Sequence, residues 1–174
     1  MQVFLIRHPR PLVEPGLCYG RLDVDCEDPQ PVAARLRLPP QTTVLSSPLR
    51  RARRLAEALA VPTRVDVRLD ARLAEIDFGD WEGRRWDDID RESIDDWAAD
   101  VLNFTPPRGE SVADLQRRVI DFSAELSAIF AGASVALITH AGVIRALLGH
   151  WRGLPVAEWT QLKCDFGSCT QIEI

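Results

Sequence analysis

The sequence predicts an α/β fold with a mostly parallel central sheet. Residues 3–6 and 134–139 are short, mostly apolar runs, which is typical of strands buried on both faces of a parallel sheet. Segments with the apolar spacing of helices lie between the strand-like segments. A histidine closely follows each buried strand, His8 after the first and His140 after the second. Because ligands of open α/β proteins bind at the carboxyl ends of the strands, both histidines are candidate site residues.

Length and composition favour one globular domain. The 174 residues are 46% hydrophobic and 27% charged, and the formal net charge of −5 argues against a general nucleic-acid binder. No apolar run reaches the length of a membrane span, and the apolar start of the chain is too short for a signal peptide. We therefore expect a single domain over 1–174, a cytoplasmic location, and neither nucleic acid nor membrane as a partner.

The four cysteines predict neither a disulfide framework nor a metal site. Cys18 and Cys26 form one pair in the sequence and Cys164 and Cys169 a distant second, without C-x-x-C spacing or a nearby histidine. Such thiols are expected to stay reduced in a cytosolic protein. No metal-ligand set and no cofactor is predicted.

A loop follows the strand that ends in Arg7 and His8. Prolines and glycines break residues 9–21, which excludes a regular element there and places a loop beside the strand end. An adjacent cation and a titratable imidazole suit an anionic ligand, phosphate above all. Arg21, at the end of this loop, is either a further anion ligand or a solvated charge, and the sequence leaves both interpretations open.

A second strand and an arginine-rich helix come next. Residues 31–38 favour a short helix that two prolines end, and residues 42–46 favour a strand. Ser47 is a suitable N-cap with proline at the first helical position, so an amphipathic helix is predicted over 48–60. It contains four arginines. We expect one in the first turn to face the anion, near the positive end of the helix dipole, and the others to be mostly solvated.

The middle of the chain predicts a short strand, a functional loop and a lid. Residues 64–68 alternate charged residues with valine, as an edge strand does. Residues 73–83 mix acids, aromatics and glycines without periodicity, which favours a functional loop over core. Residues 87–100 are acidic with one apolar side, and we interpret them as a peripheral helix that forms a lid, within an insert around 76–110.

The last third predicts a core helix, the second buried strand and a β-hairpin. Ser111 begins a capping box, and apolar residues behind it step by threes and fours through Ile129. The second strand and His140 lead into another amphipathic helix. Residues 162–174, with a turn at 165–167, are predicted to form a closing hairpin. The predicted buried side of the helix after His140 consists of Ile144, Leu147, Leu148 and Trp151.

A parallel sheet would bring the two histidines and an arginine of the first helical turn to one edge. A single histidine at a strand end is usually structural, but two of them, one beside an arginine, favour a site. A phosphomonoester carries between one and two negative charges near neutral pH, which arginine neutralises with paired hydrogen bonds. The sequence therefore predicts a phosphate site at this edge.

Five motifs in order resemble those of the histidine phosphatase (phosphoglycerate-mutase-like) superfamily, and within it most of all the α-ribazole-5′-phosphate phosphatases of cobalamin biosynthesis. The resemblance implies a three-layer α/β/α sandwich with a small helical lid insert, and a phosphomonoesterase that uses no metal. The motifs are residues 5–8 (LIRH), 46–52 (SSPLRRA), 73–83 (LAEIDFGDWEG), 109–112 (GESV) and 138–145 (ITHAGVIR).

By this resemblance, His8 is the nucleophile that takes the phosphoryl group, and Arg7, Arg51 and His140 hold its oxygens. Glu75 is the proton donor to the leaving group. Phosphoryl transfer depends mainly on positioning and charge stabilisation. An alkoxide leaving group also needs a proton, which a carboxylic acid in a partly closed pocket supplies. The same carboxylate would then activate the water that splits the phosphohistidine.

The chain departs from the family pattern directly after the Arg-His pair. Pro9 stands where the family usually has glycine, and Arg10, Pro11 and Leu12 replace its usual polar residues. We expect Pro9 to alter the neighbouring loop rather than abolish the chemistry, because proline biases His8 toward the extended backbone of a strand end. Contacts from this loop to a substrate are not carried over.

The expected partner is a small phosphorylated metabolite, either α-ribazole 5′-phosphate or a broader set. Three other functions stay open: a phosphoglycerate-mutase-type phosphotransferase, a phosphohistidine-protein phosphatase, and a non-catalytic phosphate-binding module. The mutases resemble longer chains, and the loop with Glu75 speaks against a protein phosphatase. A homodimer is an open alternative to a monomer.

Overall fold

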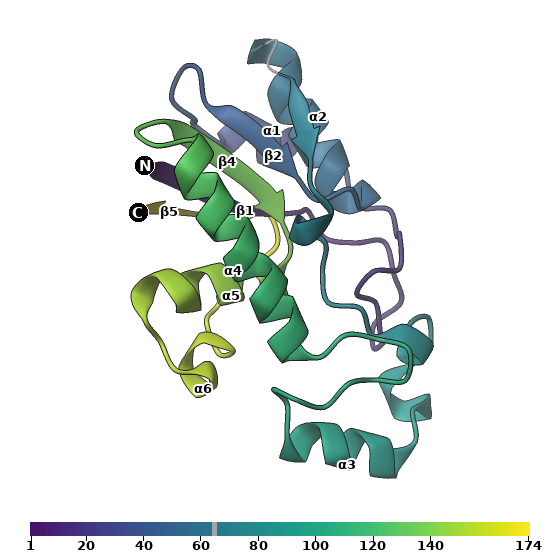
Figure 1. The fold of residues 1–174 in the computed structure, drawn as a ribbon. Helices are drawn as coiled ribbons and strands as arrows, with labels where there is room; N and C mark the ends of the chain where they lie inside the picture. Colours follow the sequence, from purple (N-terminus) through teal and green to yellow (C-terminus); the bar gives the residue numbers. More distant parts are fainter. Residues whose placement is uncertain (64–65) are drawn as a thin grey trace.

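A computed structural model of the chain describes residues 1–63 and 66–174 (Figure 1). The centre of this described part is a five-stranded sheet in the order β3-β2-β4-β1-β5. Neighbours from β3 to β1 pair in parallel, and β5 runs antiparallel to β1. The strands are β1 (Gln2–Arg7), β2 (Thr43–Ser46), β3 (Val67–Leu69), β4 (Ser134–Thr139) and β5 (Cys169–Glu173).

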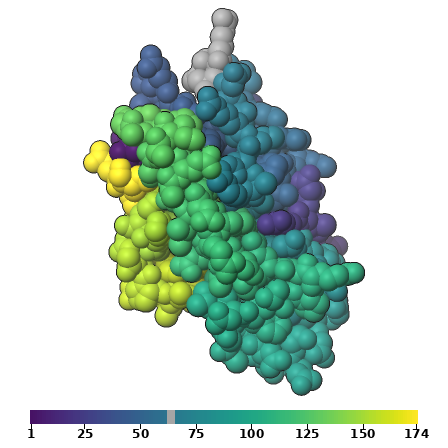
Figure 2. All heavy atoms as spheres, viewed as in Figure 1, coloured from purple at the N-terminus to yellow at the C-terminus, as the bar shows by residue number. Residues whose placement is uncertain are grey.

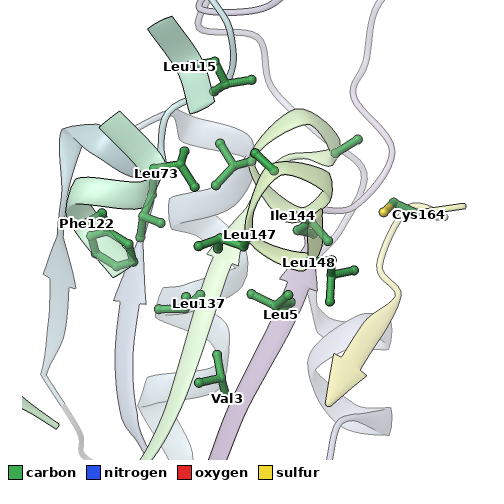
Figure 3. Packing of buried hydrophobic residues seen from close by; sticks show 14 of the residues in the cluster. Val3, Leu5, Leu73, Leu115, Phe122, Leu137, Ile144, Leu147, Leu148 and Cys164 are labelled. Atoms are coloured by element: carbon green, nitrogen blue, oxygen red, sulfur yellow. The ribbon is translucent and has the colours of Figure 1, made fainter. Parts of the chain in front are cut away.

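Helices cover both faces of the sheet. The α-helices of the described residues are α1 (Gln30–Arg35), α2 (Arg50–Thr63), α3 (Arg91–Ala99), α4 (Val112–Ile129), α5 (Ala141–Arg152) and α6 (Val156–Trp159), and all but α3 lie near the sheet. α1 and α2 pack against Phe4, Val44 and Ile138, while α4 and α5 pack on the opposite face against Leu5 and Leu137 (Figure 3). Strand neighbours belong to opposite clusters because side chains alternate between the two faces of a strand. The predicted three-layer α/β/α fold is confirmed.

The strand register brings three distant parts of the chain together. Arg7 pairs with Thr139 at the carboxyl ends of β1 and β4, so His8 and His140 leave the sheet as neighbours. In β2, Ser46 pairs with Ile138, so the start of α2 lies beside His140. The predicted meeting of the two histidines and the arginine-rich helix at one sheet edge is therefore what the structure contains.

Helix α4 begins at the predicted capping box. The Asp114 N–H donates to Ser111 Oγ at 3.1 Å, and the Ser111 N–H donates to the Asp114 carboxylate at 3.3 Å. Leu115 and Phe122 on this helix are buried in the core. The sequence predicts Ile129 on the buried side, and that prediction is wrong: Ile129, the last residue of the helix, is 59% exposed.

The insert around 76–110 forms a small cluster of its own beyond the sheet edge. It contains α3 and two short 3₁₀ helices, Gly79–Trp81 and Trp86–Asp88. Trp81 and Ile89 are buried there, and aromatic rings stack or meet edge to face. α3 lies at one end of the molecule, at the bottom of the view in Figures 1 and 2, away from the sheet. The predicted peripheral helix is thus present, while its motion as a lid stays a prediction.

The predicted hairpin over 162–174 is wrong. β5 is a strand, but within the described residues 162–168 form none. The turn at 165–167 is present, and its Gly167 N–H donates to the His8 carbonyl at 3.0 Å. The preceding segment gives its carbonyls to side chains instead of a ladder, since Cys164 accepts from Arg7 and Leu162 accepts from Arg145.

Smaller boundaries also differ from the predictions: α1 ends at Arg35 and not at residue 38, α2 runs to Thr63 and not to residue 60, and α3 begins at Arg91 and not at residue 87. α2 begins at Arg50 rather than Pro48, because Ser47 Oγ accepts the Leu49 N–H in a turn before the helix. The predicted edge strand over 64–68 is present in part as β3, and its residues 64 and 65 lie outside the described residues. In the described part of the chain, every helix is too short or too polar to span a membrane.

Candidate active site

The imidazole of His8 has a fixed orientation at the end of β1. The side chain is buried, and Nδ1 lies 2.6 Å from the carbonyl oxygen of Pro9. A carbonyl oxygen only accepts hydrogen bonds, so Nδ1 of the neutral ring carries the proton. Nε2 therefore keeps its lone pair and is the nucleophilic nitrogen of this ring.

Arg51 is the arginine of α2 that reaches His8. Its side chain is fully buried, and Nε donates to His8 Nε2 at 3.3 Å. Nη1 and Nη2 donate to the carbonyls of Leu22 and Gly20 at 2.9 and 2.5 Å, which fixes the guanidinium against the loop that follows β1. The other three arginines pair with acids instead: Arg50 with Asp23, Arg53 with Glu57 and Arg54 with Asp25.

Arg7 supplies a second guanidinium beside His8. It donates to the carbonyl of Cys164, and its Cζ lies 3.8 Å from the ring centroid of Phe166, so the group is held on two sides. Its Nε is buried and has no hydrogen-bond partner among the described residues. Buried polar atoms are nearly always paired, so this nitrogen marks a place where an acceptor would be stabilised.

His140 lies against His8, with ring centroids 5.0 Å apart. It is fully buried, and its Nε2 lies 2.8 Å from Ser47 Oγ. In the described part of the chain its Nδ1 has no hydrogen-bond partner. The site therefore contains a second buried nitrogen without a partner, on a different side chain from Arg7.

Burial keeps both histidines neutral. Desolvation, followed by the nearby Arg51 charge, lowers the pKa of His8 from 6.5 to about 3. Desolvation, followed by the neighbouring His8, likewise lowers the pKa of His140 well below its ordinary value. At neutral pH, His8 is thus an uncharged base, as a nucleophile must be, and its Nε2 lone pair accepts from Arg51 in this structure.

Glu75 approaches the same place from the loop after the 3₁₀ helix Ala71–Leu73. Its two carboxylate oxygens accept the N–H groups of Gly142 at 3.2 Å and Ile76 at 3.1 Å. Arg118 donates to the Glu75 carbonyl at 3.1 Å, which fixes the main chain as well. The carboxylate is therefore held at the start of α5, next to His140.

These groups surround a cavity of 180 Å³. Arg7, His8 and Glu75 line it, whereas Arg51 and His140 lie buried beside His8. The remaining lining residues are Tyr19, Ile76, Phe78, Ala141, Gly142 and Arg145.

Sequence reasoning gave no role to two polar residues of this lining, Tyr19 and Arg145. No local pattern points to Tyr19, which lies in the proline-broken loop. Arg145 did have a signal in the sequence. It lies four residues after Ala141, the residue that follows His140, so both lie on the same face of the predicted helix.

Arg21 lies outside this lining. Its side chain is 42% exposed and makes ion pairs with Asp77 at 4.0 Å and Glu110 at 3.7 Å. Its Nε also donates to the Glu75 carbonyl at 3.4 Å. In this structure Arg21 therefore supports the loop that carries Glu75, and contact with a substrate remains a prediction.

The described residues contain no group of three or more histidine, cysteine or carboxylate side chains placed to hold a metal ion. What they assemble instead is a neutral imidazole, the guanidiniums of Arg7 and Arg51, and a carboxylate. Such a set binds a phosphoryl group and moves a proton to or from it.

Comparison with known proteins gives the same picture. A curated relative, the adenosylcobalamin/alpha-ribazole phosphatase of Salmonella typhimurium, is 28% identical over 192 residues, covering 100% of this chain and 91% of the relative. A probable phosphoglycerate mutase of Klebsiella pneumoniae is 31% identical over 146 residues, covering 82% of this chain and 67% of the relative.

The fold matches solved structures over the same extent. The alpha-ribazole phosphatase of Shigella flexneri superposes with a TM-score of 0.89 at 26% identity, covering 100% of this chain and 91% of that one. Residues 3–174 match the family described as the histidine phosphatase superfamily (branch 1). The resemblance of the five motifs is thereby confirmed, and the chain belongs to the histidine phosphatase superfamily.

Proposed function

We propose that this chain hydrolyses small phosphomonoesters through a phosphohistidine on Nε2 of His8. One observation carries the proposal: the lone pair of Nε2 lies beside Arg51, and two further buried nitrogens near it, Arg7 Nε and His140 Nδ1, lack partners among the described residues. A phosphoryl group offers an electrophilic phosphorus to the lone pair and several acceptor oxygens to the nitrogens.

In the first step Nε2 of His8 attacks phosphorus, and the bond from phosphorus to the ester oxygen breaks. Arg7, Arg51 and His140 hold the other three oxygens, whose charge they stabilise in the transition state. Glu75 gives its proton to the departing oxygen, which leaves as a neutral alcohol. The geometry supports this role, because Glu75 is the carboxylate that lines the cavity.

In the second step the Glu75 carboxylate takes a proton from water as the water oxygen attacks phosphorus. The phosphorus–Nε2 bond breaks, inorganic phosphate leaves, and His8 is again neutral with its lone pair on Nε2. The first step needs a neutral His8, which agrees with the lowered pKa of this group.

For the substrate, we propose a small phosphorylated metabolite, with α-ribazole 5′-phosphate as the first candidate. Support comes from the Salmonella relative, whose similarity covers the whole of this chain. A phosphoglycerate-mutase activity is the second candidate, and the Klebsiella relative supports it over a smaller share of both chains.

A panel of phosphomonoesters tests the proposal. It should include α-ribazole 5′-phosphate, 3-phosphoglycerate, fructose bisphosphates and p-nitrophenyl phosphate, each with and without EDTA. We expect release of inorganic phosphate that EDTA leaves unchanged and His8→Ala abolishes. Loss with EDTA and recovery with one divalent metal would overturn the mechanism. Phosphoglycerate isomerisation without phosphate release would favour the mutase, and phosphate binding without turnover would make the chain a binding module.

A further inference from the structure

The hydroxyl group of Ser47 lies between the backbone at the start of α2 and the ring of His140. Ser47 is fully buried. Its Oγ is 3.2 Å from the Leu49 nitrogen and 2.8 Å from His140 Nε2. The Leu49 N–H is a donor only, so Oγ accepts from it. That leaves one hydroxyl proton and one lone pair to face His140.

Two arrangements of the His140 contact satisfy the distance, but they differ in their hydrogen-bond count. If Nε2 carried the ring proton, Oγ would accept twice and the Ser47 proton would find no acceptor among the described residues. If Ser47 donates to Nε2, every hydrogen bond at Oγ is made, and the ring proton lies on Nδ1. The first arrangement leaves two buried groups unpaired, the Ser47 hydroxyl proton and the Nδ1 lone pair. The second leaves only the Nδ1 proton unpaired, so the second arrangement is favoured.

We propose that Ser47 is a positioning residue that fixes His140 in the Nδ1–H tautomer. The ring nitrogen without a partner is then a hydrogen-bond donor, which is the form that a phosphoryl oxygen requires. In the opposite tautomer, Nδ1 would present a lone pair to that oxygen and repel it. The tautomer is inferred from the hydrogen-bond geometry alone. That Nδ1–H donates to a phosphoryl group rests on the proposed function.

The two histidines then use one tautomer for opposite purposes. Both carry the proton on Nδ1. His8 is held through Nδ1 by the Pro9 carbonyl and presents the lone pair of Nε2. His140 is held through Nε2 by Ser47 and presents the proton of Nδ1. One ring can thus attack phosphorus while the other donates to its oxygen, although both are neutral.

Nitrogen NMR of the protein labelled with ¹⁵N-histidine tests the tautomer directly. The chain has three histidines, so single substitutions assign the signals. We expect pyrrole-type Nδ1 and pyridine-type Nε2 for His140 in the wild type, and a shift of its Nδ1 signal when inorganic phosphate is added. In Ser47→Ala, Nε2 loses its donor and the tautomer should become mixed or reversed.

Ser46→Ala is the matched control. Ser46 is also fully buried, but its hydroxyl donates to the Ser47 carbonyl at 2.9 Å and not to His140. It should keep the wild-type tautomer and nearly the wild-type rate. Ser47→Ala should lower kcat for p-nitrophenyl phosphate by about 10²-fold, as loss of one charge-stabilising donor does, and Ser47→Thr should restore much of it.

Three results would overturn the inference: an Nε2–H tautomer in the wild type, an unchanged tautomer in Ser47→Ala, or an equal loss of rate in Ser46→Ala. If Ser47→Ala does not fold, the wild-type spectrum and Ser47→Thr still decide the question. An inactive wild-type enzyme with the expected tautomer would count against the proposed function and leave the assignment of Ser47 to His140 intact.

Discussion

The carbonyl oxygen of Pro9 lies 2.6 Å from Nδ1 of His8, the residue directly before it. This contact uses the main chain of Pro9, so it does not depend on the pyrrolidine ring. The departure from the family's usual glycine therefore changes the side chain at this position but keeps an acceptor for the His8 ring. The contact also selects Nε2 as the nitrogen that carries the lone pair.

The first prediction concerns the isomer of the phosphohistidine. Because Nδ1 is protonated and bonded to Pro9, the phosphoryl group should be found on Nε2 of His8. Quenching the reaction with p-nitrophenyl phosphate in base, followed by mass spectrometry and ³¹P NMR of the His8 peptide, distinguishes the two isomers. Pro9→Gly should retain most activity and the same isomer. Phosphate on Nδ1 would contradict the orientation described here.

The second prediction separates Arg51 from its neighbours on α2. Arg51→Met removes a buried charge beside His8 and leaves the carbonyls of Gly20 and Leu22 without their donor. We expect kcat/KM to fall by at least about 10²-fold. Arg53→Met is the control, since Arg53 is exposed and pairs only with Glu57 within the described residues. Comparable losses in the two variants would show that the charge of the helix matters and not the contact with His8.

The third prediction concerns Glu75 as acid. Glu75→Gln keeps the size of the side chain but has no proton to donate. Phosphorylation of His8 by an alkyl phosphate should slow by about 10²–10⁴-fold, the usual contribution of general acid catalysis, and by much less with p-nitrophenyl phosphate, whose leaving group needs little protonation. Rapid-quench bursts with both esters measure this. Equal slowing would assign Glu75 to positioning, and Asp77 or Glu82 would become the acid candidates.

The fourth prediction tests Glu75 by displacing its carboxylate through a substitution at the neighbouring Gly142. A Cβ at Gly142 would lie 2.3 Å from Glu75 Oε1, so Gly142→Ala must displace the carboxylate. The variant should show the ester dependence of Glu75→Gln. Gly149→Ala on the same helix is the control, because its Cβ would meet Trp159 at 2.5 Å, away from the cavity. It should lower thermal stability and affect both esters alike; an ester-dependent loss there would contradict our account of Gly142.

The fifth prediction is a pH dependence of stability. The folded chain keeps His8 and His140 neutral, whereas the unfolded chain protonates them below their ordinary pKa of 6.5. The unfolded state then binds more protons than the folded state. The contribution of the two histidines to the free energy of unfolding is therefore fully present above about pH 6.5 and is lost as the pH is lowered, for His8 down to about pH 3. Each buried histidine should contribute a slope of about 1.4 kcal/mol per pH unit within that window.

Urea unfolding in phosphate-free buffers between about pH 5 and pH 7.5 measures this slope. His8→Gln should reduce it. An unchanged slope in His8→Gln would mean that this imidazole is protonated in the folded state.

Sequence patterns and the family resemblance predicted the layers of the fold and the candidate site residues Arg7, His8, Arg51, Glu75 and His140, but not Tyr19 or Arg145. Buried strands are recognisable as apolar runs, and α4 as a capping box followed by helical spacing, because both signals are local. Topology then placed His8 and His140 at one sheet edge. The choice of Arg51 and Glu75 came from the resemblance to the family, because residue patterns alone left the first-turn arginine unspecified.

Which nitrogen of each histidine carries the proton follows from tertiary contacts that sequence patterns do not contain. The contact between Ser47 and His140 joins residues 93 positions apart, and no spacing in the sequence predicts it. The same holds for residues 162–168. Carbonyl groups of this segment accept hydrogen bonds from the side chains of Arg7 and Arg145 instead of pairing with a neighbouring strand. Hydrogen bonds of buried side chains depend on which distant segments exclude water from them, and that is fixed only when the whole chain is packed.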